Sequence, residues 1–138
     1  MTKKSIWLPL MLLFVLPIIG CGGEFTRVSG TVTFSDGAPV TRGNVVFTDG
    51  TYSATGVIRS DGSFVLTSLN HDDGARPGVY TVILQRNWSD EYDDDGNVIR
   101  VDPFEVDSRF SCREASGLTF TIEAGKRNVA NFVVERRE

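Results

Sequence analysis

The sequence has few of the residues that most often perform catalysis or hold metals, with one histidine and two cysteines among its 138 residues. Histidine is the commonest acid–base group and metal ligand near neutral pH, so a lone histidine argues against sites that need a pair. Two cysteines allow at most one disulfide. Long apolar runs are also scarce, because the longest, residues 6–19, falls short of the roughly 20 residues that a membrane-spanning helix needs.

The first 20 residues are typical of an export signal. Lys3 and Lys4 precede the apolar stretch, which Pro9 and Pro17 interrupt, and its length suits the hydrophobic region of a signal peptide. Removing residues 1–20 takes away two lysines and no acid, so the net charge falls from −4 to −6. This acidic balance argues against nucleic-acid binding and against a general electrostatic surface for anionic membranes.

The apolar stretch ends in Leu16-Pro17-Ile18-Ile19-Gly20-Cys21, which resembles the lipobox of bacterial lipoproteins. The resemblance implies that Cys21 becomes the first residue of the mature chain, with a diacylglycerol on its sulfur and an acylated amine. Several acyl chains on one residue give stable anchoring. Gly22, not Asp, follows Cys21, and this by the same resemblance implies the outer membrane. The alternatives are an ordinary signal peptide and an uncleaved anchor; residues 21–26 are expected to form a short tether.

The second cysteine, Cys112, would be the only thiol left once Cys21 carries a lipid. No internal disulfide is then possible, although two chains could still pair through Cys112. We expect Cys112 to be a small buried hydrophobic residue, which is the commoner use of a free cysteine.

Residue usage after position 20 favours strands, with 15 valines, 11 threonines and eight phenylalanines. Alternation of apolar and polar residues, with turn signals between the segments, predicts strands at 28–34, 44–48, 51–59, 64–67, 79–85, 118–123 and 129–134. The segment 79–85 is apolar on both faces, so we expect it to be central in its sheet. Residues 27–138 are therefore predicted to form an all-β domain, a seven-stranded antiparallel β-sandwich.

Short motifs follow one another in a recognisable order along this domain. They are a V-x-G-x-V strand from Val28, an Asp-Gly-x-Pro turn at 36–39, an Asp-Gly-x-Phe hairpin at 61–64 and Gly-x-Tyr at 78–80. This order resembles the carboxypeptidase regulatory-like, or transthyretin-like, β-sandwich, whose architecture is similar to that of Ig-like domains. The stretches 116–122 and 131–134 further resemble a group of small bacterial lipoproteins built on that domain. The resemblance implies a binding or structural module that performs no chemistry of its own.

Four residues in these motifs have roles that follow from physical chemistry alone. Gly30 leaves room where a strand is crossed, and Gly37 and Gly62 can take a positive φ in turns. Tyr80 can bury its ring while its hydroxyl bonds a loop. All of these roles serve folding.

Enzymes built on this kind of fold use residues that the chain lacks. A zinc carboxypeptidase-like site and the intradiol dioxygenases each need two histidines, and the hydroxyisourate hydrolases end in Tyr-Arg-Gly-Ser. Here His71 stands alone in a polar loop, and the chain ends Val134-Glu-Arg-Arg-Glu138. We expect no enzymatic activity and no cofactor, with His71 solvated.

Residues 87–108 form an acidic excursion from the compact pattern. Their net charge is −7, with Arg100 set against eight acids, so the rest of the chain after residue 20 sums to +1. The acids are Asp90, Glu91, Asp93, Asp94, Asp95, Asp102, Glu105 and Asp107.

Four of these acids, Glu91, Asp93, Asp95 and Asp102, have partial EF-hand spacing around Gly96 and are weak candidates for calcium ligands. Glu stands at the usual first Asp position, and no helices are expected on either side. The favoured alternative is a solvated hairpin that turns at Asp95-Gly96. Trp88 and Tyr92 are weak candidates for a surface that binds sugar or protein, although each could instead cover an edge of the sandwich.

The sequence as a whole predicts a non-enzymatic, lipid-anchored envelope protein that acts as a structural or binding module. The expected partners are the membrane, through the lipid on Cys21, and an unidentified envelope protein or polysaccharide, with no nucleic acid. We expect a monomer. The alternative function is a calcium-dependent adhesion or carbohydrate-binding module that uses residues 90–102.

Overall fold

The computed structural model describes residues 25–87, 91–100 and 104–138. The predicted signal peptide, Cys21, Trp88 and Asp102 lie outside these ranges, and the side chains of Glu91 and Arg100 are likewise not described. Within the described ranges the protein is all-β, with no α-helix and one short 3₁₀ helix, η1 (Ser108–Ser111).

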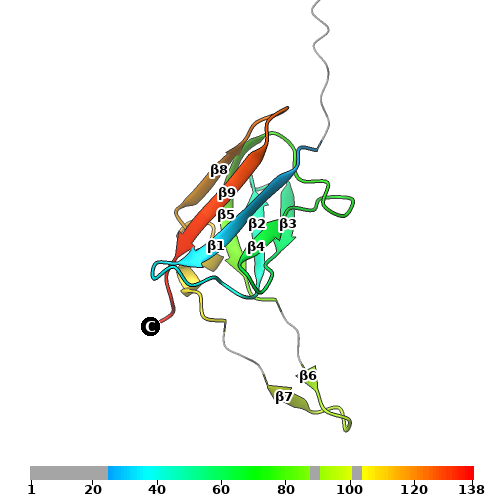
Figure 1. Ribbon diagram of the computed structural model, residues 1–138, viewed down its shortest axis with the longest axis vertical. Helices are drawn as coiled ribbons and strands as arrows, with labels where there is room; N and C mark the ends of the chain where they lie inside the picture. The colour runs from blue at the N-terminus through cyan, green and yellow to red at the C-terminus, as the bar shows by residue number, and fades with distance from the viewer. Residues whose placement is uncertain (1–24, 88–90, 101–103) are drawn as a thin grey trace, which may run out of the picture.

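The strands form two sheets that pack against each other and one separate hairpin (Figure 1). The first sheet has the order β4 (Ser63–Val65), β1 (Val28–Phe34), β9 (Asn128–Val134). The second has the order β3 (Ser53–Val57), β2 (Asn44–Thr48), β5 (Gly78–Gln85), β8 (Leu118–Ile122). The hairpin consists of β6 (Glu91–Tyr92) and β7 (Val98–Arg100).

Two features of this topology correct the sequence prediction. The described residues contain nine strands instead of seven, because the acidic excursion adds the two strands of the hairpin. The sandwich is also not purely antiparallel, since β1 and β9 pair in parallel from Val28↔Asn128 to Phe34↔Val134. β8 runs opposite to β1, and the turn after β8 reverses the chain. β9 therefore enters the other sheet in the same direction as β1. Alternation along a strand predicts its buried face but not the direction of its neighbour.

The alternating pattern itself is confirmed in the two strands that begin and end the sandwich. Every second residue of β1 is buried, from Val28 to Phe34, and β9 shows the same period from Asn128 to Val134. β5 lies between β2 and β8, which confirms its predicted central place. A strand with neighbours on both edges and cover on both faces needs apolar side chains on both faces.

The core is an aromatic cluster centred on Phe47 of β2. Its ring lies 5.8 to 6.3 Å, centroid to centroid, from four other rings, which come from both sheets. These are Phe64, Tyr80, Phe120 and Phe132. Such pairs stabilise a core beyond the area they bury, so this cluster joins the two sheets.

Gly30 lies where β1 passes closest to its neighbour. A Cβ at this position would lie 1.7 Å from the carbonyl oxygen of Ala130 in β9 and 3.0 Å from the Phe64 ring. Only glycine permits this approach, which confirms the spacing role predicted from the sequence. The predicted role of Tyr80 is also confirmed, because its ring is buried and its hydroxyl donates to the carbonyl oxygen of Arg76 at 2.8 Å.

Candidate functional site

The sandwich has two ends that differ in what they present to solvent. We call the end where Thr26 leads into β1 the proximal end, and it also carries the 66–77 loop and the 123–127 turn. β5 begins beside that loop and runs for eight residues, about 26 Å, toward the opposite, distal end. The β6–β7 hairpin lies beyond the distal end, at the bottom of Figure 1.

The acidic hairpin is closed by Asp93, whose carboxylate organises the turn. Its Oδ1 accepts from the backbone N–H of Asp95 at 3.0 Å and of Asn97 at 2.7 Å, and its Oδ2 accepts from the Asn97 side-chain amide at 3.2 Å. The bonds from Asn97 hold the pKa of Asp93 below its ordinary value, because they favour the charged carboxylate. Gly96 takes a φ of +81° in this turn.

This arrangement bears on the four candidate calcium ligands. Both carboxylate oxygens of Asp93 accept hydrogen bonds within the turn. Asp95 is exposed, and the side chain of Glu91 and the whole of Asp102 lie outside the described residues. No group of three or more His, Cys, Asp or Glu side chains that could hold a metal occurs in the described part of the chain. The hairpin predicted as the alternative to an EF-hand loop is the structure that forms.

The aromatic candidates in the excursion are only partly described. Tyr92 is 60% exposed, so its ring is not buried against a sheet edge, and Trp88 lies outside the described residues. Val98 and Ile99 on β7 are also exposed, at 50% and 61%. The hairpin therefore presents apolar side chains beside its acids, as a surface for a protein partner would.

Two further predictions concern single residues of the sandwich. The His71 side chain is 89% exposed and lies 3.1 Å from Asp72, as expected for a solvated histidine. The expectation that Cys112 is buried is wrong, because Cys112 is an exposed free thiol whose Sγ donates to Glu114 at 3.2 Å. It follows η1 directly, and the turn residues 112–116 lie on the surface except Ser116.

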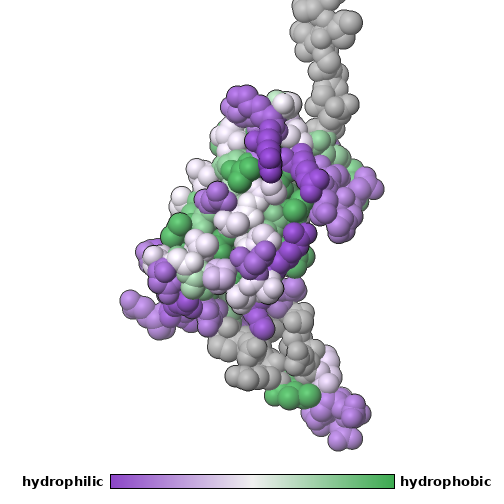
Figure 2. Space-filling view, viewed as in Figure 1, coloured by the Kyte–Doolittle hydropathy of each residue, from purple (hydrophilic) through white to green (hydrophobic). Residues whose placement is uncertain are grey.

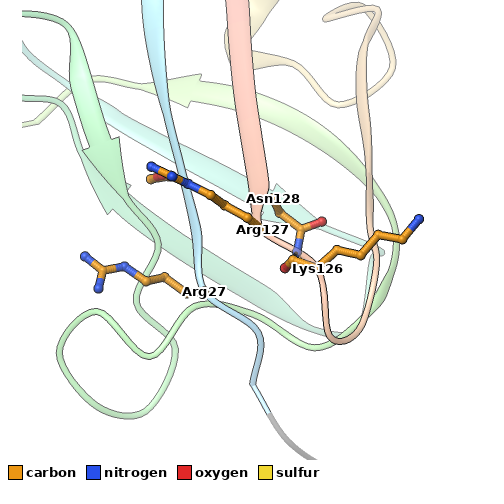
Figure 3. Close-up of a pocket in the computed structure, with 5 residues that line it drawn as sticks. Arg27, Lys126, Arg127 and Asn128 are labelled. Atoms are coloured by element: carbon orange, nitrogen blue, oxygen red, sulfur yellow. Dashed lines mark hydrogen bonds between the residues drawn. The ribbon is translucent and has the colours of Figure 1, made fainter.

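A basic hollow that sequence reasoning did not find lies at the proximal end. It has a volume of about 490 Å³ and is lined by Arg27, Ser29, Lys126, Arg127 and Asn128. Arg27 and Arg127 immediately precede Val28 and Asn128, which pair in parallel, so the two arginines stand on neighbouring strands at the same level. In Figure 3 their side chains extend to the same side of the strands, while Lys126 extends to the other side.

The turn that carries two of these cations is held rigidly by Asn128. The side chain of this buried residue accepts from the backbone N–H of Glu123 at 3.0 Å and donates to the carbonyl oxygens of Glu123 and Lys126, each at 3.1 Å. Lys126 then pairs with Glu123 at 2.8 Å. The side chains of Arg27 and Arg127 make no hydrogen bond or ion pair with another described residue, and both residues are exposed.

The point where the chain joins the sandwich is also fixed. Thr26 and Ala75 exchange two backbone hydrogen bonds, of 2.7 and 3.0 Å, and the guanidinium group of Arg76 lies 5.8 Å from the centre of the Phe25 ring. Asp73 holds the loop that supplies Ala75, since its carboxylate accepts from the backbone N–H groups of residues 68, 69 and 70. The first described residues are thus part of the rigid domain.

A second hollow at the distal end differs from the first because one of its two arginines is already paired. It has a volume of about 240 Å³ and is lined by Phe104, Glu105, Arg136, Arg137 and Glu138. Arg136 binds Glu105 at 2.7 Å and Asp36 at 3.4 Å and lies over the Phe34 ring. The basic hollow at the proximal end is therefore the stronger candidate for a ligand.

In comparisons with known proteins, no family model, no curated protein and no solved structure matches the chain. In the part of the chain that the structure describes, no helix has the length and apolar character needed to cross a bilayer.

One feature of the sequence could have indicated the basic hollow, namely the basic residues just before the first and the last strand of the sandwich. Lys126-Arg127 is a basic pair just before the last strand, and Arg27 stands just before the first. Only the parallel pairing of β1 with β9 brings Arg27 beside Arg127, across 100 positions of sequence.

Proposed function

We propose that this chain is a non-enzymatic, lipid-anchored protein of the cell envelope, held by Cys21, and that it resembles the transthyretin-like domains as a scaffold only. Its β-sandwich stands at the membrane surface and presents the acidic β6–β7 hairpin to a protein or polysaccharide partner. The outer membrane is the proposed location, as Gly22 after Cys21 implies.

One observation carries the proposal: the tether joins the proximal end, and the hairpin lies beyond the distal end. A domain anchored through Cys21 would therefore hold the exposed Tyr92, Val98 and Ile99 away from its own anchor, where another molecule can reach them. Two packed sheets of three and four strands are compatible with the transthyretin-like resemblance, although fold alone does not determine function.

Thiol counting tests the anchor on the mature protein. With a thioether at Cys21, a maleimide reagent finds one reactive thiol per denatured chain, that of Cys112. Radiolabelled palmitate should enter the wild-type chain and not a Cys21→Ser variant, whereas Cys112→Ser should leave incorporation unchanged. Two reactive thiols, or palmitate that persists in the Cys21→Ser variant, would remove the lipid anchor.

A crosslinking experiment tests the role of the hairpin. A photoreactive amino acid at position 98, on the exposed hairpin, should capture an envelope component in intact cells. The same group at position 57, an exposed valine on β3, is the matched control. Equal capture from both positions would contradict presentation by the hairpin.

Calcium separates this function from the calcium-dependent alternative. Because both Asp93 oxygens already accept hydrogen bonds within the turn, we expect millimolar calcium to leave the thermal midpoint of the protein unchanged. A ligand that binds only the folded state would raise that midpoint, so a calcium-dependent rise would favour the alternative.

A further inference from the structure

We infer that the basic hollow formed by Arg27 and Arg127 binds the headgroup of an anionic phospholipid in the membrane that holds the Cys21 anchor, and so sets the orientation of the domain. This inference rests on the proposed lipid anchor. It assigns a second, electrostatic membrane contact to a domain whose overall charge is negative.

Covalent geometry places the hollow within reach of the bilayer. Four peptide steps separate Cys21 from Phe25, and each spans at most about 3.6 Å, so Phe25 lies within about 14 Å of the anchored residue. Thr26 is hydrogen-bonded to Ala75 and leads directly into β1. Arg27 is only two residues beyond Phe25, so the length of the chain allows it to reach the membrane surface.

The two guanidinium groups suit a phosphate headgroup. Arg27 and Arg127 stand side by side on parallel strands, extend in the same direction, and have no partner among the described residues. Arginine binds phosphate through two parallel N–H donors. Ser29, one step farther along the outer face of β1, lines the same hollow and adds a hydroxyl donor.

The charges of the domain are arranged to favour one orientation. Hydrophilic side chains, both basic and acidic, gather at the proximal end, over the 123–127 turn and the 66–77 loop (Figure 2), whereas the hairpin beyond the other end is strongly acidic. Electrostatic forces from a charged membrane fall off over roughly 10 Å at physiological salt. The short chain between Cys21 and Phe25 allows the proximal arginines to come within this range, and a negative surface repels the hairpin. The net charge of −6 argues against a general electrostatic surface for anionic membranes, but the proximal end can still make a local contact through its arginines.

Energy transfer from Cys112 to the bilayer tests the inference on the full mature protein. Cys112 is exposed and, with Cys21 lipidated, is the only thiol to which a donor dye can attach. The labelled, lipidated protein is reconstituted in vesicles that carry an acceptor lipid, with phosphatidylcholine alone or with about 30 mol% phosphatidylglycerol, so that only the surface charge differs. We expect transfer to differ between the two compositions, because docking of the proximal end fixes the height of Cys112 above the bilayer, and to return to the phosphatidylcholine value in about 0.5 M salt.

Charge reversal identifies the residues. The double variant R27E/R127E should lose the dependence on phosphatidylglycerol, and R27K/R127K should keep part of it. The matched control is R59E/R137E, which makes the same change in net charge at two exposed arginines of the distal end. Inorganic phosphate at millimolar concentration should not abolish the effect in wild type, which separates a membrane-bound headgroup from a free anion.

Each outcome decides one point. Two reactive thiols per chain, or loss of the protein from vesicles in high salt, would overturn the anchor and this inference with it. One thiol and firm vesicle retention, with transfer equal in both lipid compositions, would overturn the headgroup contact alone. Equal loss of the effect in R27E/R127E and R59E/R137E would replace the site by a general charge effect, and competition by millimolar phosphate would reassign the hollow to free anions.

Discussion

The sandwich and the β6–β7 hairpin both contain aromatic and β-branched side chains but are held by different forces. In the sandwich, valines and aromatic side chains from both sheets are buried together around Phe47. In the hairpin, Tyr92, Val98 and Ile99 are exposed, and the turn depends on one carboxylate. Burial therefore specifies the first region, and local hydrogen bonds specify the second. A region with few buried contacts can change in sequence with little effect on the fold, which suits a surface that meets a partner.

The two regions should differ most in the effect of truncating one aromatic side chain in each. Phe47→Ala should lower the free energy of unfolding by about 4 kcal/mol, because it empties the centre of the aromatic cluster. Tyr92→Ala should change it by less than about 0.5 kcal/mol, because that ring is mostly in solvent. Urea unfolding followed by circular dichroism measures both. A similar loss in the two variants would mean that the hairpin is part of the core.

The next largest effect concerns the close approach of β1 and β9. Gly30→Ala should cost about 3 kcal/mol of unfolding free energy, since the new methyl group would meet the Ala130 carbonyl and the strands would have to separate. Gly117→Ala is the control: its φ is +66° but nothing lies within 4 Å of the added Cβ, so only about 1 kcal/mol of backbone strain is expected. Equal costs for the two would show that β1 and β9 separate with little cost and that their close approach does not require glycine at position 30.

A smaller loss is expected where the core meets the proximal loop. Tyr80→Phe removes the hydroxyl that donates to Arg76 and leaves a carbonyl oxygen without that donor, at a cost of about 1 kcal/mol. Because Arg76 lies in the loop that pairs with Thr26, the amide of Ala75 should also exchange faster with deuterium. Exchange that rises equally at the distal end would contradict a local effect.

The strands, the central place of β5 and the role of Gly30 could be predicted because each depends on local alternation or on the size of one residue. The parallel pairing of β1 with β9 could not, because nothing in either strand encodes the direction of its neighbour. The basic hollow depends on that pairing and was missed for the same reason. The prediction that Cys112 is buried rested on how often free cysteines are buried in proteins. In the structure it follows a short 3₁₀ helix on the surface. The hairpin was predictable from Asp95-Gly96, whereas the use of Asp93 as its cap required the geometry.

The smallest expected effects come from two aspartates that cap turns, one in each region. Asp73 divides its hydrogen bonds between both oxygens, which accept three backbone N–H groups of the 66–77 loop. Partial desolvation raises the pKa of Asp73, but the bonds from Asn70, Ser68 and Leu69 outweigh it and leave the pKa lowered. Asparagine offers one acceptor oxygen, so Asp73→Asn must lose bonds and should lower the thermal midpoint. Asp93→Asn can keep both backbone bonds to Oδ1, so the midpoint should stay within about 1 °C of wild type.

Acid titration distinguishes the same two positions. A carboxyl whose pKa is lower in the folded state stabilises that state above its unfolded pKa of about 3.9, and the stabilisation disappears as the pH falls through the folded value. The thermal midpoint of wild type should therefore fall below pH 4, and this fall should be shallower in Asp73→Asn but unchanged in Asp93→Asn. Protonation of Asp93 should instead show in the Asn97 amide resonance, with a midpoint below the ordinary value of 3.8. If Asp93→Asn flattened the acid dependence of global unfolding as much as Asp73→Asn, the hairpin and the sandwich would unfold as one unit.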